Sequence, residues 1–158
     1  MPHLTVNGIN LHYQQTGNGP DVVLVHAFTS NMAIWLLTGL VEKLADEYRV
    51  TTYDLRGHGV SEIPASGYTS AEMMEDLHQL HTALGLEPAY LVGHSFGGVV
   101  AMHLAAEHPE LVQGVIVSDT YFPGLKDIEP NIADTAIWTE LRQDLLKAGI
   151  DIGERVAF

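Results

Sequence analysis

Ser95 has the surroundings in this sequence that best suit covalent chemistry. It stands in the run Gly93-His94-Ser95-Phe96-Gly97, after the apolar residues 90–92 and before a stretch of helical character. A serine hydroxyl is a useful nucleophile only when the backbone holds it in place and a base accepts its proton. Flanking glycines permit a sharp strand-to-helix turn, and a helix start offers free N–H groups to a developing oxyanion. The pattern predicts a nucleophile for acyl transfer; the competing interpretation is an ordinary glycine-rich turn with a serine cap.

The elements around this turn alternate between strand and helix patterns. Apolar runs at 22–25, 50–53, 90–92 and 112–117 are typical of parallel strands covered on both faces, and apolar spacing predicts helices at 31–48, 70–84 and 95–107. We expect residues 4–9 and 10–15 to form antiparallel strands near the turn signal Asn7-Gly8, and Ser70 to cap the second helix. The predicted fold class is α/β, a mostly parallel sheet with helices on both faces.

Composition limits the partners that we expect. The chain carries 20 acidic and 7 basic residues, a net charge of −13, which repels nucleic acid and anionic lipid. It has no cysteine, and its nine histidines lack the spacing of a metal site. No apolar run approaches the roughly 18 residues of a membrane span, and no signal-peptide pattern opens the chain. We therefore expect a cytoplasmic protein that uses no metal and binds neither membrane nor nucleic acid.

Three separated motifs resemble the α/β-hydrolase superfamily in its usual order. They are His26-Ala27-Phe28, the run from Tyr53 to Ser61 (YDLRGHGVS), and Gly93-His94-Ser95-Phe96-Gly97-Gly98. The resemblance covers nearly the whole chain and is greatest to esterases, lactonases and carbon–carbon bond hydrolases with a helical cap after the sixth strand. It implies a hydrolase core at residues 1–120 and, at 121–158, the start of the cap or a swapped C-terminal arm.

The resemblance also implies a site. Ser95 would be the catalytic nucleophile, the backbone N–H groups of Phe28 and Phe96 would form the oxyanion hole, and no cofactor is implied. The expected substrate is a small or medium apolar ester, and a serine at this position disfavours the aspartate-dependent epoxide hydrolases and dehalogenases as guides. Ala27 departs from the glycine that the family more often has, which puts the geometry of this loop in question.

Six further polar residues invite a catalytic interpretation. Asp119 follows the sixth strand, where some family members place the acid of the triad and many have a non-catalytic aspartate. We expect the ring of His94 to face away from Ser95, because neighbouring residues at a strand end point in opposite directions. We expect His26 to be structural, and the loop with Asp54, Arg56 and His58 to be a scaffold with room for an internal ion pair.

The triad histidine that the family places after its last strand is missing from this sequence. Its last histidine is His108, so the resemblance implies a truncated fold without the last two strands and an impaired serine hydrolase. The strand at 112–117 would then be an apolar sheet edge, which predicts a homo-oligomer or a strand-exchanged dimer. Two alternatives stay open: a catalytically silent scaffold that self-assembles or binds a ligand, and a rewired dyad of Asp119 with a nearby histidine.

Overall fold

A computed structural model of the protein describes residues 2–120. The chain divides into two compact units, Met1–Thr120 and Tyr121–Phe158. The expected cap segment or swapped arm at 121–158 therefore lies outside the described residues, and the fold below is that of the first unit.

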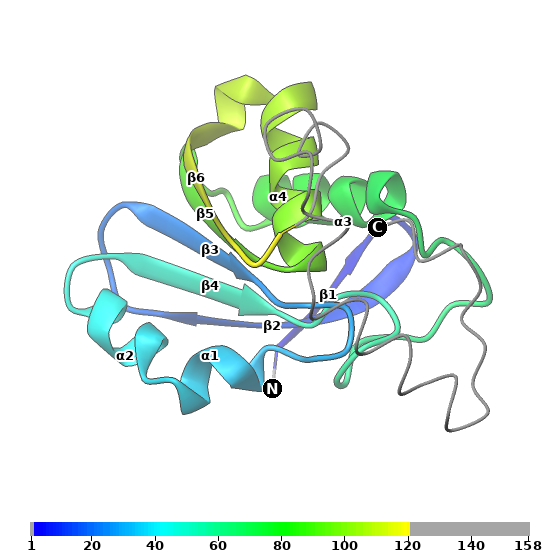
Figure 1. The fold of residues 1–158 in the computed structure, drawn as a ribbon, viewed down its shortest axis with the longest axis horizontal. Coiled ribbons are helices and arrows are strands. Elements are labelled where there is room, and N and C mark those ends of the chain that lie inside the picture. The colour runs from blue at the N-terminus through cyan, green and yellow to red at the C-terminus, as the bar shows by residue number, and fades with distance from the viewer. Residues whose placement is uncertain (1, 121–158) are drawn as a thin grey trace, which may run out of the picture. The chain divides into compact units, whose positions relative to one another are not determined.

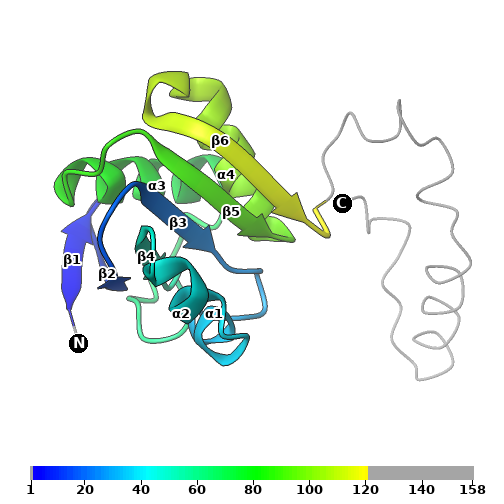
Figure 2. The ribbon, with the colours of Figure 1, turned by 90° about the vertical axis from the view of Figure 1, so that its left-hand side faces the viewer.

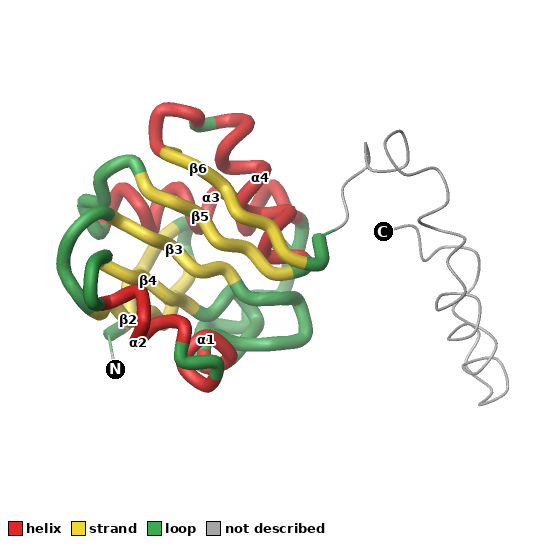
Figure 3. Tube along the Cα trace, turned by 60° about the vertical axis from the view of Figure 1, so that its left-hand side comes forward, coloured by secondary structure: helices red, strands yellow, loops and turns green. Residues whose placement is uncertain are grey.

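Within residues 2–120, one sheet contains six strands in the order β1-β2-β4-β3-β5-β6 (Figure 1). The strands are β1 (His3–Val6), β2 (Ile9–Thr16), β3 (Asp21–Val25), β4 (Arg49–Tyr53), β5 (Ala89–His94) and β6 (Val112–Ser118). β4, β3, β5 and β6 are parallel, whereas β1 and β2 pair antiparallel. The tube in Figure 3 shows these strands side by side, with β6 at one edge. The expected mostly parallel sheet is confirmed.

The turn between β1 and β2 forms at Asn7 and Gly8, as predicted. Both residues have positive φ, 47° and 74°, the backbone that lets a two-residue turn match the twist of its strands. Val6 pairs with Ile9 across the turn. β2 then continues alongside β4 and joins the hairpin to the parallel strands.

Helices cover both faces of the sheet. Helices α3 (Ser70–Ala83) and α4 (Phe96–Glu107) lie on one face, and the short helices α1 (Ala33–Leu37) and α2 (Leu40–Ala45) lie on the other (Figures 1 and 2). A single 3-10 turn, η1 (Pro109–Leu111), connects α4 to β6. The layering explains the unbroken apolar run at 22–25 of β3: Val23 belongs to the core cluster that contains Leu77 of α3, and Val22 belongs to the cluster that contains Trp35 of α1.

The single helix predicted for residues 31–48 is wrong, because the segment forms two helices. Gly39 breaks it with a φ of 70°, a left-handed conformation that ends a helix. The hydroxyl of Thr38 also donates to the carbonyl of Trp35 at 3.0 Å and satisfies a group that a continuing helix would have used. Apolar spacing continued across Gly39 and so concealed the break.

Helix α3 begins one residue earlier than its predicted cap implies. Thr69, not Ser70, is the N-cap: its Oγ1 accepts the N–H of Glu72 at 3.3 Å and donates to the Glu72 carboxylate at 2.9 Å. This reciprocal arrangement resembles a capping box. Gly85, with a φ of 59°, follows the helix as expected.

The face of the sheet beyond α2 is open over β5 and β6. A groove there is lined by Val22, Leu44, Tyr48, Tyr90, Val92 and Ile116. Ile116 is 62% exposed, because no described helix covers this part of the sheet face (Figure 2). Nowhere in residues 2–120 is there a helix of the length and apolarity needed to cross a membrane.

Candidate active site

Ser95 connects the end of β5 to the first turn of α4 with a strained backbone. Its φ of 51° and ψ of −119° lie outside the regions that side-chain-bearing residues normally adopt. Its N–H donates to the carbonyl of Ser118 at 2.8 Å. Its carbonyl accepts the N–H of Gly98 at 2.9 Å and the hydroxyl of Thr120 at 3.0 Å. Three hydrogen bonds thus hold the strained peptide groups while leaving the Ser95 side chain out of the network.

The braces from Ser118 and Thr120 were not predicted. They reach Ser95 only because β6 lies beside β5, with His94 opposite Ser118 in the pairing. No local pattern in the sequence connects residue 120 with residue 95, so this part of the site needed the structure.

The flanking glycines are required by close backbone contacts. A Cβ on Gly97 would lie 2.5 Å from the carbonyl oxygen of His26, and one on Gly93 would lie 2.5 Å from the nitrogen of Gly98. Real Cβ atoms do not approach so closely, and the opposing atoms are main chain that cannot turn aside. The first turn of α4 therefore rests directly on the end of β3, next to the loop that carries Phe28.

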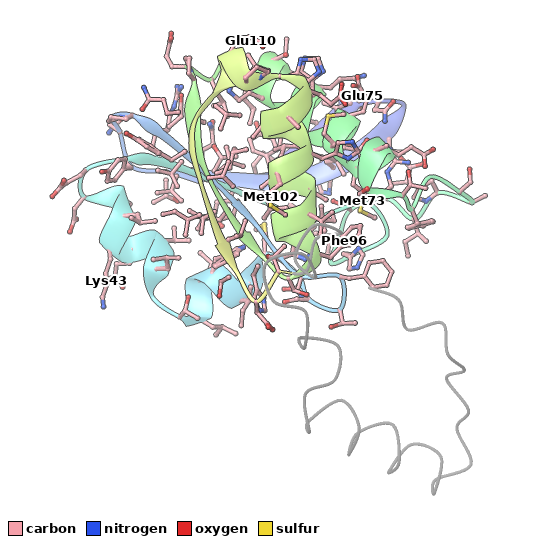
Figure 4. The ribbon with its side chains drawn as sticks, turned by 45° about the horizontal axis from the view of Figure 1, so that its top comes forward. Lys43, Met73, Glu75, Phe96, Met102 and Glu110 are labelled. Carbon is pink, nitrogen blue, oxygen red and sulfur yellow. The ribbon has the colours of Figure 1, made fainter. Side chains whose placement is uncertain are left out.

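The two predicted oxyanion-hole residues lie against each other. The rings of Phe28 and Phe96 meet edge-on with centroids 5.6 Å apart. Phe96 begins α4, at the opposite end of the helix from Glu110 (Figure 4). Among residues 2–120 neither the Phe28 nor the Phe96 N–H donates a backbone hydrogen bond, so both remain free for a ligand oxygen. Ala27 has no positive φ, so the alanine does not strain this loop.

His26 is fully buried and structural, as expected. Its Nδ1–H donates to the carbonyl of Ala27 at 2.8 Å, and its Nε2 accepts the N–H of Leu55 at 3.0 Å. These two bonds require the neutral ring. Burial lowers the pKa of His26, and repulsion from His58 acts in the same direction. The ring joins the loop after β3 that carries Phe28, here named the oxyanion loop after its predicted role, to the loop after β4.

Asp54 is the centre of the scaffold that supports the oxyanion loop. Its carboxylate accepts the N–H of Met32 at 2.8 Å, a bond from Nδ1 of His12 at 2.9 Å, and the N–H of Val60 at 3.1 Å. A carboxylate that accepts several hydrogen bonds holds its partners firmly. Asp54 therefore ties together three segments that are distant in sequence, and its role is structural.

The ion pair that the loop makes is not internal to it. Arg56 reaches out to Asp76 on α3, with Nε and Nη2 on the two carboxylate oxygens at 2.7 and 2.5 Å. Both side chains are almost completely buried, at 5% and 1% exposure. The hydrogen bonds that Arg56 donates to Asp76 raise the pKa of Arg56. The loop is thus fastened to α3 by a desolvated two-point contact.

No described residue serves as a base for Ser95. Within residues 2–120 the Ser95 hydroxyl has no hydrogen-bond partner, and the Asp119 carboxylate forms no ion pair or hydrogen bond with a described side chain. Asp119 is exposed and has a φ of 51° directly after β6. Among residues 2–120, the structure therefore places the predicted nucleophile Ser95 next to Phe96, which packs on Phe28, and shows no residue in contact with the Ser95 hydroxyl as a triad base.

The chain has the fold and the sequence of a known family. A parallel α/β sheet with a strained serine between strand and helix defines a class of enzymes with a nucleophile on a sharp turn. The sequence model of the alpha/beta hydrolase fold matches residues 20–147. The chain belongs to the α/β-hydrolase family.

Its relatives differ in the reactions for which they are named. A soluble epoxide hydrolase from a Corynebacterium species is 33% identical over 76% of this chain, and a 2-(acetamidomethylene)succinate hydrolase from Mesorhizobium japonicum is 34% identical over 72%. An enol-lactonase structure from Burkholderia xenovorans superimposes with a TM-score of 0.72 at 31% identity and covers 92% of this chain. The matches span 41% and 40% of the two sequence relatives and 58% of the lactonase. The chain therefore corresponds to less than two thirds of any of the three.

Proposed function

We propose that the chain carries the nucleophile and oxyanion hole of a serine hydrolase that acts on carboxylic esters or related acyl compounds. The observation that carries the proposal is the strained backbone of Ser95 at the start of α4, next to the free N–H groups of Phe28 and Phe96. A nucleophile beside oriented N–H donors is the arrangement that acyl transfer requires.

In the proposed reaction, Ser95 Oγ attacks the acyl carbon and gives up its proton, and the carbonyl oxygen becomes an oxyanion bound by Phe28 and Phe96. The tetrahedral species then collapses, the C–O bond to the alcohol breaks, and the alcohol leaves with a proton. Water hydrolyses the resulting acyl-enzyme. Without a positioned base the first proton transfer is slow, so we expect turnover by this chain to be impaired.

Asp119 remains the proposed triad acid of the family arrangement. It lies one residue beyond Ser118, whose carbonyl holds the Ser95 N–H. An acid at this place acts through a histidine, which it orients and stabilises. On its own it would contribute nothing to the attack by Ser95.

The proposed substrate class is supported by the side chains near Ser95 and by the reactions for which similar proteins are named. The edge-on rings of Phe28 and Phe96 favour an apolar acyl group. A lactonase among the similar structures is named for an acyl substrate, whereas the relative named as an epoxide hydrolase suggests different chemistry. The serine at position 95 favours the acyl reaction, because a hydroxyl that forms an ester needs an acyl carbon to attack.

A catalytically silent scaffold is the second candidate, and the open apolar face over β5 and β6 favours it. Ile116 and Val117 are 62% and 40% exposed on the edge strand, which suits self-assembly of copies into a homo-oligomer or strand-exchanged dimer. In either function we expect no nucleic acid or membrane partner, in keeping with the net charge of −13. A cytoplasmic location is part of the same proposal.

The test combines a fluorophosphonate probe with p-nitrophenyl acetate, applied to the full chain and to Ser95→Ala. Labelling and turnover that both vanish in the variant support a working site. Labelling without turnover supports a nucleophile site that lacks its base. If the chain gives no labelling above Ser95→Ala, the hydrolase proposal is wrong and the silent scaffold is favoured.

Ser61→Ala is the matched control. Ser61 is a buried serine whose hydroxyl donates to the carbonyl of Asp54 at 2.7 Å, in the scaffold rather than at the nucleophile. We expect this variant to be labelled at Ser95 like the unchanged chain, provided that it remains folded by circular dichroism.

A further inference from the structure

His58 lies between two carbonyl oxygens. It belongs to the loop after β4, and its Nδ1 faces the carbonyl oxygen of Arg56 at 2.8 Å. Its Nε2 makes a short contact with the carbonyl oxygen of Phe28 on the oxyanion loop. A carbonyl oxygen only accepts hydrogen bonds, so each ring nitrogen must carry a proton to form its bond. The neutral ring carries one such proton and the imidazolium carries two.

The neighbouring His26 has the opposite requirement. The centroids of the two rings are 5.3 Å apart, yet His26 donates from Nδ1 and accepts at Nε2, which only a neutral ring can do. One carbonyl acceptor and one N–H donor surround His26, whereas two carbonyl acceptors surround His58. The hydrogen-bond partners of His26 thus fit a neutral ring, whereas those of His58 fit a ring with a proton on both nitrogens.

Phe28 is held at two points by His58. Besides the bond to its carbonyl, the Phe28 ring meets the His58 ring edge-on at 5.2 Å and packs on Phe96 at 5.6 Å. Phe28 is otherwise 48% exposed. Among the described residues, His58 is therefore the main polar contact that fixes the conformation of Phe28, whose N–H is the proposed oxyanion donor.

We propose that His58 is a positioning residue that acts as an imidazolium and clamps Phe28 so that its N–H points at the oxyanion. This proposal rests on the proposed function, because it gives the oxyanion hole its rigidity. The charge of the ring also favours an anion near Phe28. Loss of the proton removes one of the two donated bonds and leaves two lone pairs facing each other.

The described groups near His58 that can carry charge include His26, Arg56 and Asp54. His26 is neutral by its hydrogen bonds. The guanidinium of Arg56 is turned away and neutralised by Asp76. The Asp54 carboxylate lies close behind Gly59, where an added Cβ would come within 2.5 Å of it. Phe28 and Phe96 carry no charge.

The clamp predicts a pH dependence of Ser95 acylation that is opposite to that of a general base. A histidine that acts as a general base must be neutral, so its contribution increases as the pH rises. The clamp works only when His58 is protonated, so acylation of Ser95 should instead decrease when the imidazolium loses its proton. A charged hydrogen bond contributes enough for a roughly tenfold decrease in the labelling rate.

The first test needs no activity. Nitrogen-15 NMR of the full chain reports the protonation of each ring nitrogen, with His58→Gln and His26→Asn to assign the signals. We expect both His58 nitrogens to carry protons near about pH 6 while His26 carries one. A His58 ring with one unprotonated nitrogen under those conditions would overturn the proposal, whether or not Ser95 reacts.

The second test follows fluorophosphonate labelling of Ser95 between about pH 5.5 and pH 8.5. We compare the unchanged chain with His58→Gln, which keeps one donor, and His58→Ala, which keeps none. Labelling rates, each divided by that of His58→Ala at the same pH, should fall as the pH rises in the unchanged chain and stay constant in His58→Gln. His58→Gln should react faster than His58→Ala at every pH.

His103→Gln on α4 is the matched control, because it removes a histidine away from the oxyanion loop and should keep the pH dependence. A merely structural His58 would give variants with lower rates but the same pH dependence as the unchanged chain, which would contradict the clamp. If no form is labelled at Ser95, the proposed function fails and the NMR result still decides the state of His58.

Discussion

At the scale of single residues, the main chain sets the geometry of this site. Gly97 lets the first turn of α4 touch the end of β3, and Ser95 accepts an unfavourable backbone because three hydrogen bonds hold it. Steric contact and hydrogen bonding both act on peptide groups here. Substitutions that add a Cβ at these contacts should therefore cost more than those that change exposed side chains.

Gly97→Ala tests this statement. The new Cβ would meet the carbonyl oxygen of His26 at 2.5 Å, so strands and helix must separate, and we expect the free energy of unfolding to fall by about 1–3 kcal/mol. Urea unfolding measures the change. Gly114→Ala is the control, because its Cβ would meet only the movable ring of Tyr90 at 3.3 Å. A cost equal in both variants would contradict the argument.

His26 should make stability depend on pH. Burial lowers its pKa in the folded chain, so below about pH 6.5 the unfolded chain takes up a proton that the folded chain does not. This contribution is complete above that pH and is lost as the pH falls through the lowered pKa. His26→Asn should therefore reduce the loss of unfolding free energy between about pH 7 and pH 5, measured as the difference from the unchanged chain. An identical pH profile in both would contradict it.

At the scale of elements, one buried ion pair fastens the loop after β4 to helix α3. Asp76 accepts two bonds from Arg56 and also the side-chain amide of Asn7 at 2.9 Å. Three elements therefore meet at one carboxylate: the β1–β2 turn, the loop and α3. Such a pair adds little compared with apolar packing but is costly to break on one side.

Asp76→Asn should destabilise the chain by about 3–5 kcal/mol, because it leaves the buried guanidinium of Arg56 without its counter-charge. Thermal and urea unfolding measure this loss. Glu75→Gln, on the exposed side of the same helix, should change stability by less than about 1 kcal/mol. A small effect at Asp76 would show that the loop relaxes and lets Arg56 reach water.

The elements themselves were largely predictable, because their signals are local. The turn at Asn7-Gly8 and the serine between β5 and α4 each depend on a few adjacent residues. The helix break at Gly39 was missed because apolar spacing continued through it, and the cap was misplaced by one residue between two suitable side chains. The partner of Arg56 lies 20 residues away on α3, and the braces on Ser95 come from another strand. Contacts of this kind depend on how helices and strands pack together. The spacing of residues along the sequence does not reveal that packing.

At the scale of the whole molecule, the described unit has one covered face and one partly open face. Helices α3 and α4 close one side of the sheet, while α1 and α2 leave the groove between Tyr48 and Ile116 open. β6 has no charged residue along its length. In a chain with a net charge of −13, an uncharged edge is the place where a second copy meets least repulsion.

The proposed self-association should depend on this edge. Ile116→Lys puts a charge on a side chain that is already 62% exposed, so we expect it to leave the fold intact and to convert oligomers to monomers. Sedimentation velocity at micromolar concentration measures the change. Val60→Lys, also exposed at 59% but on a distant loop, should not alter the oligomeric state. A monomeric unchanged chain would refute the self-association.

The contact between Gly97 and the end of β3 has a consequence for protein engineering. Because peptide groups support position 95, the side chain of the proposed nucleophile can be exchanged without changing the groups that hold it. Cysteine or aspartate could be substituted at position 95, and their reactivities could be compared within the same surrounding backbone. A change of the single codon for position 95 can therefore alter the reaction while the surrounding backbone stays the same.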